Sequence, residues 1–220
     1  MTNRLTQAHH QRDPQLARFV ETVHETLESE PAVTAVAQTV AGYMSELLKT
    51  WRMPDPRYLE RQPGCRYGSY LLYRAPDYSF VVVIDTFDRG QSTQIHNHRT
   101  WAVVGLLDGA ERNEIFEVPS GFSAPPRLLR EQVTRPGEVL TMMETDMHRL
   151  QTDQGQYSLS LHVYGAEVGT IRRVRWDDQA HRYVEFRQGW SNDAIGLPLY
   201  LDCPALTEME IRRQCLGYLK

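Results

Sequence analysis

Two stretches near the N-terminus carry apolar residues at the spacing of an amphipathic helix. Residues 14–30 and 33–50 both repeat this pattern over several turns. The apolar positions of the first stretch are Leu16, Phe19, Val20, Val23 and Leu27. Asp13 can cap the first helix, and Pro14 suits a first helical position because its missing N–H needs no partner there. We therefore expect two helices whose apolar faces pack against the rest of the protein.

From Tyr67 onward the pattern changes to short apolar or alternating runs that are separated by turns. Asp108 and Gly109 lie between two such runs and form a hairpin signal. The candidate strands are 67–74, 79–87, 101–107, 111–118, 127–133, 138–143, 147–152, 157–164 and 171–175. Many short strands at regular spacing favour a sandwich or a double-sheet barrel. We expect a mostly β fold of the jelly-roll and cupin class, with α-helices at its N-terminal end.

The same pattern suggests how the chain is divided. Residues 1–64 are expected to form an N-terminal helical segment packed on the barrel, with a connecting loop over 52–64. Residues 65–185 would form the barrel and carry the functional site, and residues 186–220 a C-terminal extension with a short helix near 207–218. We expect these parts to make a single structural domain.

Composition narrows the partners and the compartment. A formal net charge of −4 gives no reason to expect a nucleic-acid partner. No apolar run approaches the roughly 18 residues that span a bilayer, and residues 1–12 lack the apolar core of a signal peptide. The cysteines, Cys65, Cys203 and Cys215, are scattered and odd in number, which suits a reducing compartment. We expect a cytoplasmic protein without a membrane or nucleic-acid partner; the oligomeric state stays open.

Histidines supply the first candidate chemistry. His96 and His98 are separated by one residue and lie between two apolar runs, so on a strand their side chains would share one face. Imidazole is a common metal ligand that suits iron, zinc, copper or nickel. The alternative is a pair of exposed polar residues in a loop, and short motifs carry this risk. His148 and His162 follow further along the chain.

The stretch around His162 alternates strictly. Ser160, His162 and Tyr164 share one face of a strand, and three apolar residues share the other. The polar set can line a metal-bearing interior. Alternatively, the run is an ordinary edge strand whose polar face is in water.

Taken together, these motifs resemble the thiol dioxygenases of the cupin superfamily, the family of cysteine dioxygenase and 3-mercaptopropionate dioxygenase. The resemblance consists of His-x-His at His96 and His98, a single His148, and Ser-x-His-x-Tyr ending at Tyr164. It covers residues 67–195 and is greatest with the bacterial branch. It implies an iron(II) cofactor held by His96, His98 and His148. It also implies an outer-sphere triad in which Ser160 holds His162 and His162 holds Tyr164, whose hydroxyl would lie beside the iron.

The resemblance leaves the substrate-binding residue open. Arg173 matches the arginine that binds the substrate carboxylate in the 3-mercaptopropionate branch. Tyr70 stands where cysteine dioxygenase has its arginine, with Arg66 and Arg74 four residues to either side. Val103 stands where mammalian cysteine dioxygenase has a cross-linked cysteine. These departures favour a mercaptoalkanoate over cysteine.

The resemblance therefore implies an enzyme, an iron-dependent thiol dioxygenase. It would oxidise a small thiol carboxylate, 3-mercaptopropionate-like or cysteine, to its sulfinate with dioxygen. One alternative is a metal-binding cupin that is not an oxygenase, such as an isomerase or a small-molecule sensor, because one fold hosts many functions. The other is a structural barrel without metal.

Overall fold

The computed structural model describes residues 13–30, 32–60, 66–153 and 155–201. The expected polar stretch 1–12 and the expected helix near 207–218 lie outside the described residues. Within them, no helix combines the length and the apolar character that a passage through a bilayer requires.

Two N-terminal helices form as the apolar spacing predicts: α2 spans Pro14–Ser29 and α3 spans Val33–Thr50. Asp13 caps α2 by accepting a hydrogen bond from the backbone N–H of Leu16 at 2.9 Å. Its other carboxylate oxygen accepts a hydrogen bond from the indole N–H of Trp51, just beyond α3, at 2.6 Å. One buried carboxylate therefore holds the start of α2 against the end of α3.

The strands follow at the predicted positions, with small shifts at their ends. They are β1 (Gly68–Arg74), β2 (Val81–Phe87), β3 (Ala102–Gly109), β4 (Glu111–Glu117), β5 (Arg127–Thr134), β6 (Val139–Met142), β7 (Met147–Gln151), β8 (Ser158–Tyr164), β9 (Arg173–Asp177) and β10 (Arg182–Phe186). The sequence pattern missed β10 and the short helices η1 (Pro56–Leu59), η2 (Ser120–Phe122) and α4 (Ser191–Ile195).

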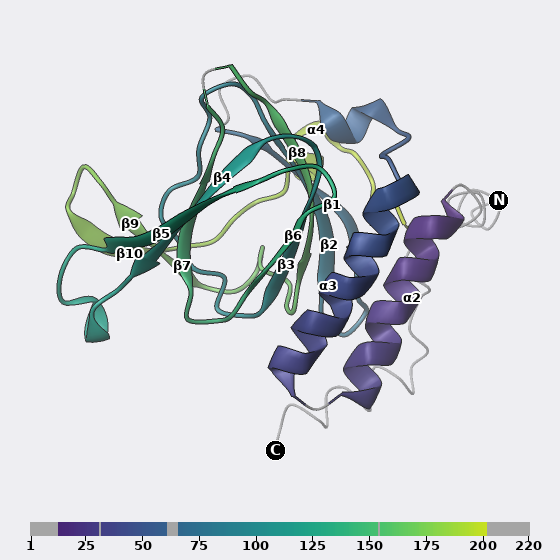
Figure 1. The fold of residues 1–220 in the computed structure, drawn as a ribbon, viewed down its shortest axis with the longest axis horizontal. Helices are drawn as coiled ribbons and strands as arrows, with labels where there is room; N and C mark the ends of the chain where they lie inside the picture. Colours follow the sequence, from purple (N-terminus) through teal and green to yellow (C-terminus); the bar gives the residue numbers. More distant parts are fainter. Residues whose placement is uncertain (1–12, 31, 61–65, 154, 202–220) are drawn as a thin grey trace.

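Antiparallel pairing arranges these strands in two sheets and a two-stranded ribbon. The larger sheet has the order β1-β2-β8-β3-β6, the smaller sheet the order β5-β4-β7, and β9 pairs with β10. The two sheets form a barrel, and α2 and α3 cover the outer face of the larger sheet (Figure 1). The expected fold class is confirmed: a mostly β, cupin-like double-sheet barrel with N-terminal helices.

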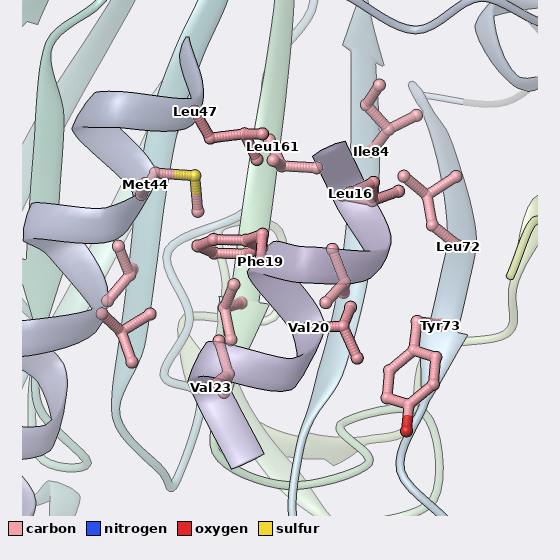
Figure 2. Packing of buried hydrophobic residues seen from close by; sticks show 14 of the residues in the cluster. Leu16, Phe19, Val20, Val23, Met44, Leu47, Leu72, Tyr73, Ile84 and Leu161 are labelled. Atoms are coloured by element: carbon pink, nitrogen blue, oxygen red, sulfur yellow. The ribbon is translucent and has the colours of Figure 1, made fainter. Parts of the chain in front are cut away.

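Apolar side chains join the helices to the larger sheet. Phe19 of α2 and Met44 of α3 lie close to Leu161 of the central strand β8, and all three are buried (Figure 2). A glycine allows α3 to approach β3, because a Cβ at Gly105 would lie 2.7 Å from the Leu48 Cδ1 atom and 2.9 Å from the Met44 Cγ atom. Both helices therefore pack against the larger sheet through their apolar faces, as predicted.

The central strand β8 divides the two sides of the sheet. Leu161 and Val163 belong to the apolar cluster beneath the helices, whereas Ser160, His162 and Tyr164 point into the barrel. Those three residues are buried, and β8 is hydrogen-bonded to β2 on one side and β3 on the other. The alternative of a solvated edge strand is therefore wrong, and the polar face of β8 lines the interior.

Candidate metal centre

Three histidines from two distant segments meet inside the barrel. His96 and His98 precede β3, and His148 lies on β7. Backbone hydrogen bonds of 2.9 Å in both directions join His96 to His148, so the two segments are held side by side. One ring nitrogen from each of the three histidines lies within 4.8 Å of the others, and all three residues are buried. The alternative of an exposed histidine pair in a loop is therefore wrong.

The segment around His96 is not the regular strand that the sequence suggested. His96 forms isolated bridges to His148 and Arg175, and Arg99 has a positive φ of 53°. These bridges, rather than a continuous ladder, direct His96 and His98 to the same point. The prediction that His96 and His98 converge is therefore correct, but the regular strand from which it was made is absent.

Hydrogen bonds at the Nδ1 atoms of His96 and His148 leave the Nε2 atoms free to bind a metal. The backbone carbonyl of Gln94 lies 2.8 Å from His96 Nδ1, and the Asn113 side-chain oxygen lies 3.0 Å from His148 Nδ1. Both oxygens can only accept, so each Nδ1 carries the hydrogen and each Nε2 keeps its lone pair. His148 Nε2 also lies 3.1 Å from His98 Nε2. Two ring nitrogens that converge in this way suit a cation bound by both.

Electrostatics keep the histidines neutral at physiological pH. Burial lowers the pKa of His96 to about 3, and it lowers the pKa values of His98 and His148 well below their usual range. The nearby charge of Arg173 acts in the same direction on all three. Within the described part of the chain, no carboxylate joins the group. The donor set is therefore three neutral imidazoles, a buried metal site that would leave a divalent ion its full charge.

Asn113 was not anticipated from the sequence, and it gives a first testable prediction. Asn113→Ala removes the acceptor that fixes the His148 tautomer, and loss of such partners typically weakens metal binding about 10- to 100-fold. A competition titration with a metallochromic chelator measures this change. Gln132→Ala, at the position opposite Asn113 on the exposed strand β5, is the matched control and should bind metal like the parent protein. Equal affinities for the two variants would contradict the assignment.

A hydrogen-bonded row of side chains runs away from the histidine cluster. The Tyr164 ring packs edge-on against His98, with 4.8 Å between ring centroids. The Tyr164 hydroxyl lies 2.8 Å from His162 Nδ1, and His162 Nε2 lies 2.8 Å from Ser160 Oγ. Burial lowers the pKa of His162 to about 4 and raises that of Tyr164 well above its usual value. All members of the row are therefore neutral at pH 7.

Arg173 is the buried cation of the site. Its side chain is only 1% exposed, and its guanidinium lies 4.6 Å from the centre of the Phe186 ring. One terminal nitrogen donates to the Gln188 side-chain oxygen at 2.7 Å, while the Nε atom is buried and has no hydrogen-bond partner among the residues that the structure describes. Burial lowers the pKa of Arg173, but its usual value is so high that the group stays charged. A buried guanidinium with a free donor is suited to bind an anion.

A pocket of about 200 Å³ opens beside His96. Its lining is rich in cations and contains the ring of Tyr67 and the side chain of Gln188; the lining residues are Arg66, Tyr67, Thr93, Gln94, His96, Arg175, Phe186, Arg187 and Gln188. Arg66, considered from the sequence, therefore lies at this pocket. A small anion could approach the histidine cluster from this side.

The structure does not bring the other candidate residues to the histidines. Tyr70 packs against Tyr58 beneath the helices, and its hydroxyl donates to the backbone carbonyl of Glu60. Arg74 forms a 3.7 Å ion pair with Glu167. Val103 is also buried beneath the helices, on the side of the sheet opposite Tyr164.

Matches to solved structures are weak, with identities below 20% and TM-scores below 0.5. No family model matches the sequence. A solved oxalate oxidase in complex with the substrate analogue glycolate is 13% identical; the match covers 49% of this chain and 56% of that one, with a TM-score of 0.39. A cupin 2 conserved barrel domain protein from Leptotrichia buccalis is 19% identical. The match covers 51% of this chain and 47% of that one, with a TM-score of 0.39.

A second cupin 2 conserved barrel domain protein, from Rhodopseudomonas palustris, is 13% identical, with 55% of this chain and 75% of that chain covered and a TM-score of 0.41. This chain thus matches only about half the length of the oxalate oxidase and of the Leptotrichia protein. The convergence of His96, His98 and His148 defines the metal site.

Proposed function

We propose that this protein is an iron-dependent thiol dioxygenase that oxidises a small thiol carboxylate to its sulfinate. The observation that supports this function best is the row from Tyr164 through His162 to Ser160 beside a site of three neutral histidines. A site that only bound a metal would not need a buried tyrosine held in this way. The resemblance of the combined sequence motifs to thiol dioxygenases points in the same direction.

Each part of the site has a task in the proposed reaction. Iron(II) held by His96, His98 and His148 would favour binding of the substrate as thiolate and supply the oxygen chemistry. Arg173 would bind the substrate carboxylate through its unused donor, which orients the sulfur toward the histidines. Tyr164 would hydrogen-bond the reacting groups, and the buried walls would exclude water.

Steady-state turnover with several thiols tests the proposal. Iron-loaded protein should consume dioxygen and 3-mercaptopropionate in equal amounts and give the sulfinate, which mass spectrometry identifies by its two added oxygen atoms. Cysteine should be a poorer substrate than 3-mercaptopropionate, because the departures from cysteine dioxygenase favour a mercaptoalkanoate. Mercaptosuccinate, a mercaptoalkanoate with a second carboxylate, tests whether the site accepts a larger acid. Protein stripped of metal is the control and should be inactive.

Two results would favour the alternatives. Stoichiometric metal by elemental analysis without dioxygen uptake on any of the three thiols would indicate a metal-binding cupin that is not an oxygenase. Purified protein that binds no divalent metal would indicate a structural barrel.

A further inference from the structure

The row of side chains behind Tyr164 does not end at Ser160. The Ser160 hydroxyl donates a 2.7 Å hydrogen bond to the side-chain oxygen of Glu111, at the start of β4. Glu111 is only 1% exposed and has no cation within ion-pair distance among the described residues. Burying an ionised carboxylate without a cationic partner costs folding free energy, which indicates that Glu111 has a function at the end of this row.

The ionised state of Glu111 sets the direction of every hydrogen bond in the row. An ionised carboxylate only accepts, so Ser160 must donate to it and must in turn accept from His162 Nε2–H. His162 Nδ1 then has no hydrogen and accepts from the Tyr164 hydroxyl. In this state the Tyr164 oxygen turns its lone pairs toward the histidine cluster.

Protonation of Glu111 reverses the whole row. A protonated Glu111 donates to Ser160, Ser160 donates to His162 Nε2, and the His162 hydrogen moves to Nδ1. His162 Nδ1–H then donates to the Tyr164 oxygen, and the tyrosine hydrogen points toward the histidine cluster. The two states differ by one proton on Glu111 and by one tautomer of His162.

A second buried carboxylate lies close to the same imidazole. Asp85 of β2 has one oxygen 3.6 Å from His162 Nε2, and its other oxygen accepts from Ser69 Oγ at 2.6 Å. Burial raises the pKa of Asp85 to about 7, although the hydrogen bond from Ser69 and the charge of Arg173 oppose this. Burial raises the pKa of Glu111, with a smaller contribution from the charge of Asp85, while His162 and the hydroxyls of Ser160 and Ser158 oppose the rise. The environment therefore favours uptake of a proton by the carboxylate pair.

We propose that Glu111 is the proton acceptor at the far end of a relay that starts at the substrate thiol and runs through Tyr164, His162 and Ser160. This inference rests on the proposed function for the identity of the proton donor. The relay itself depends only on the four side chains and their hydrogen bonds.

The transfer balances without a charged intermediate in the relay. The thiol S–H bond breaks and its proton goes to the Tyr164 oxygen, while the tyrosine hydrogen moves to His162 Nδ1. The hydrogen on His162 Nε2 moves to Ser160, and the Ser160 hydrogen moves to Glu111. A thiolate remains on the substrate, and Tyr164 now presents a donor to the site. Oxidation of a thiol to a sulfinate releases one proton overall, which Glu111 gives up to water before the next turnover.

The relay can be tested without metal or substrate. In metal-free protein with ¹⁵N-labelled histidine, the NMR shifts of the His162 ring nitrogens report which one carries the hydrogen. We expect the hydrogen on Nε2 at high pH and on Nδ1 after Glu111 takes up a proton. In Glu111→Gln the side chain cannot ionise, so this pH-dependent tautomer change should be lost.

Two further variants make the test specific. Glu117→Gln removes a carboxylate from the exposed end of the same strand, where it pairs with Arg127, and should keep the tautomer change. Ser160→Ala keeps Glu111 but breaks its connection to His162, so it should lose the change as Glu111→Gln does. Ser160→Ala also decides the matter if Glu111→Gln does not fold.

Turnover supplies the second readout. Because the relay needs ionised Glu111, kcat/KM of the parent protein should rise with pH as Glu111 ionises. Glu111→Gln should lose this rise and lower kcat/KM about 10- to 100-fold, as is usual for outer-shell partners. A His162 tautomer that does not change with pH in the parent protein, or that still changes in Glu111→Gln, would overturn the relay. Absence of thiol oxidation by the parent protein would instead overturn the proposed function, while the NMR result still decides the relay.

Discussion

His148→Ala should abolish metal binding at the site. His148 supplies one of three nitrogen ligands, and its Nε2 atom faces that of His98 at 3.1 Å. Loss of an outer-shell partner alone costs about 10- to 100-fold in affinity, so loss of a ligand should cost more than this. Elemental analysis after dialysis against iron(II) should give close to one ion per chain for the parent protein and almost none for the variant. Thiol oxidation should be lost with the metal.

A matched control separates this effect from a general loss of histidine. His181→Asn removes an exposed imidazole at a position with a positive φ of 48°, a conformation that asparagine tolerates. This variant should bind iron like the parent protein. Because His148 is buried, the thermal unfolding of the variant must be recorded as well, and His148→Gln provides a version of similar size. A folded His148 variant with a full complement of iron would refute the ligand assignment.

The helices were predictable because one simple pattern decides them. Apolar residues at helical spacing must be buried on one side, and Asp13 and Pro14 mark the start of α2. The strands were predictable for a similar reason, because a short apolar run between two turns is too short for a helix and usually forms a strand. The missed strand β10 lacks this signal, because Arg182–Phe186 has partly exposed residues on both faces.

Polar residues inside the barrel were harder to read. Ser160, His162 and Tyr164 were recognised as one face of a strand, but sequence alone left open whether that face was wet or buried. Glu111 and Asn113 were missed because residues 111–114 are all polar, so the pattern marks no inward-facing side. Only the pairing of β4 with β7 shows that this face points toward the histidines.

Counting along the chain also failed to place Tyr70. The position of a residue relative to a motif does not show which side of a sheet its side chain faces. Tyr70 was expected at the substrate site, but it faces the helices. The register of β1 against β2 shifts between Leu71 and Tyr73, so alternation does not continue through to Arg74. Arg173 comes instead from a different strand, β9, whose pairing partner was not visible in the sequence.

Arg173→Gln should cause a large loss of activity toward thiols that carry a carboxylate. A hydrogen bond to a charged group contributes about 1.5–3 kcal/mol, which corresponds to a decrease of roughly 10- to 150-fold in kcat/KM. The loss should be greater for 3-mercaptopropionate than for 2-mercaptoethanol, because 2-mercaptoethanol has no carboxylate that Arg173 could bind. Steady-state dioxygen uptake with both thiols measures the difference, and the iron content of each preparation must be matched first.

Arg172→Gln is the natural control for this experiment. Arg172 is adjacent in sequence, but it is exposed and lies 3.6 Å from Glu185 in a surface ion pair. Such pairs contribute little to stability, so this variant should retain the parent activity with both thiols. If Arg173→Gln lowered turnover of both thiols equally, the guanidinium would act on the site as a whole, and the carboxylate would have to be bound elsewhere. The three arginines of the pocket beside His96 would then be the next residues to replace: Arg66, Arg175 and Arg187.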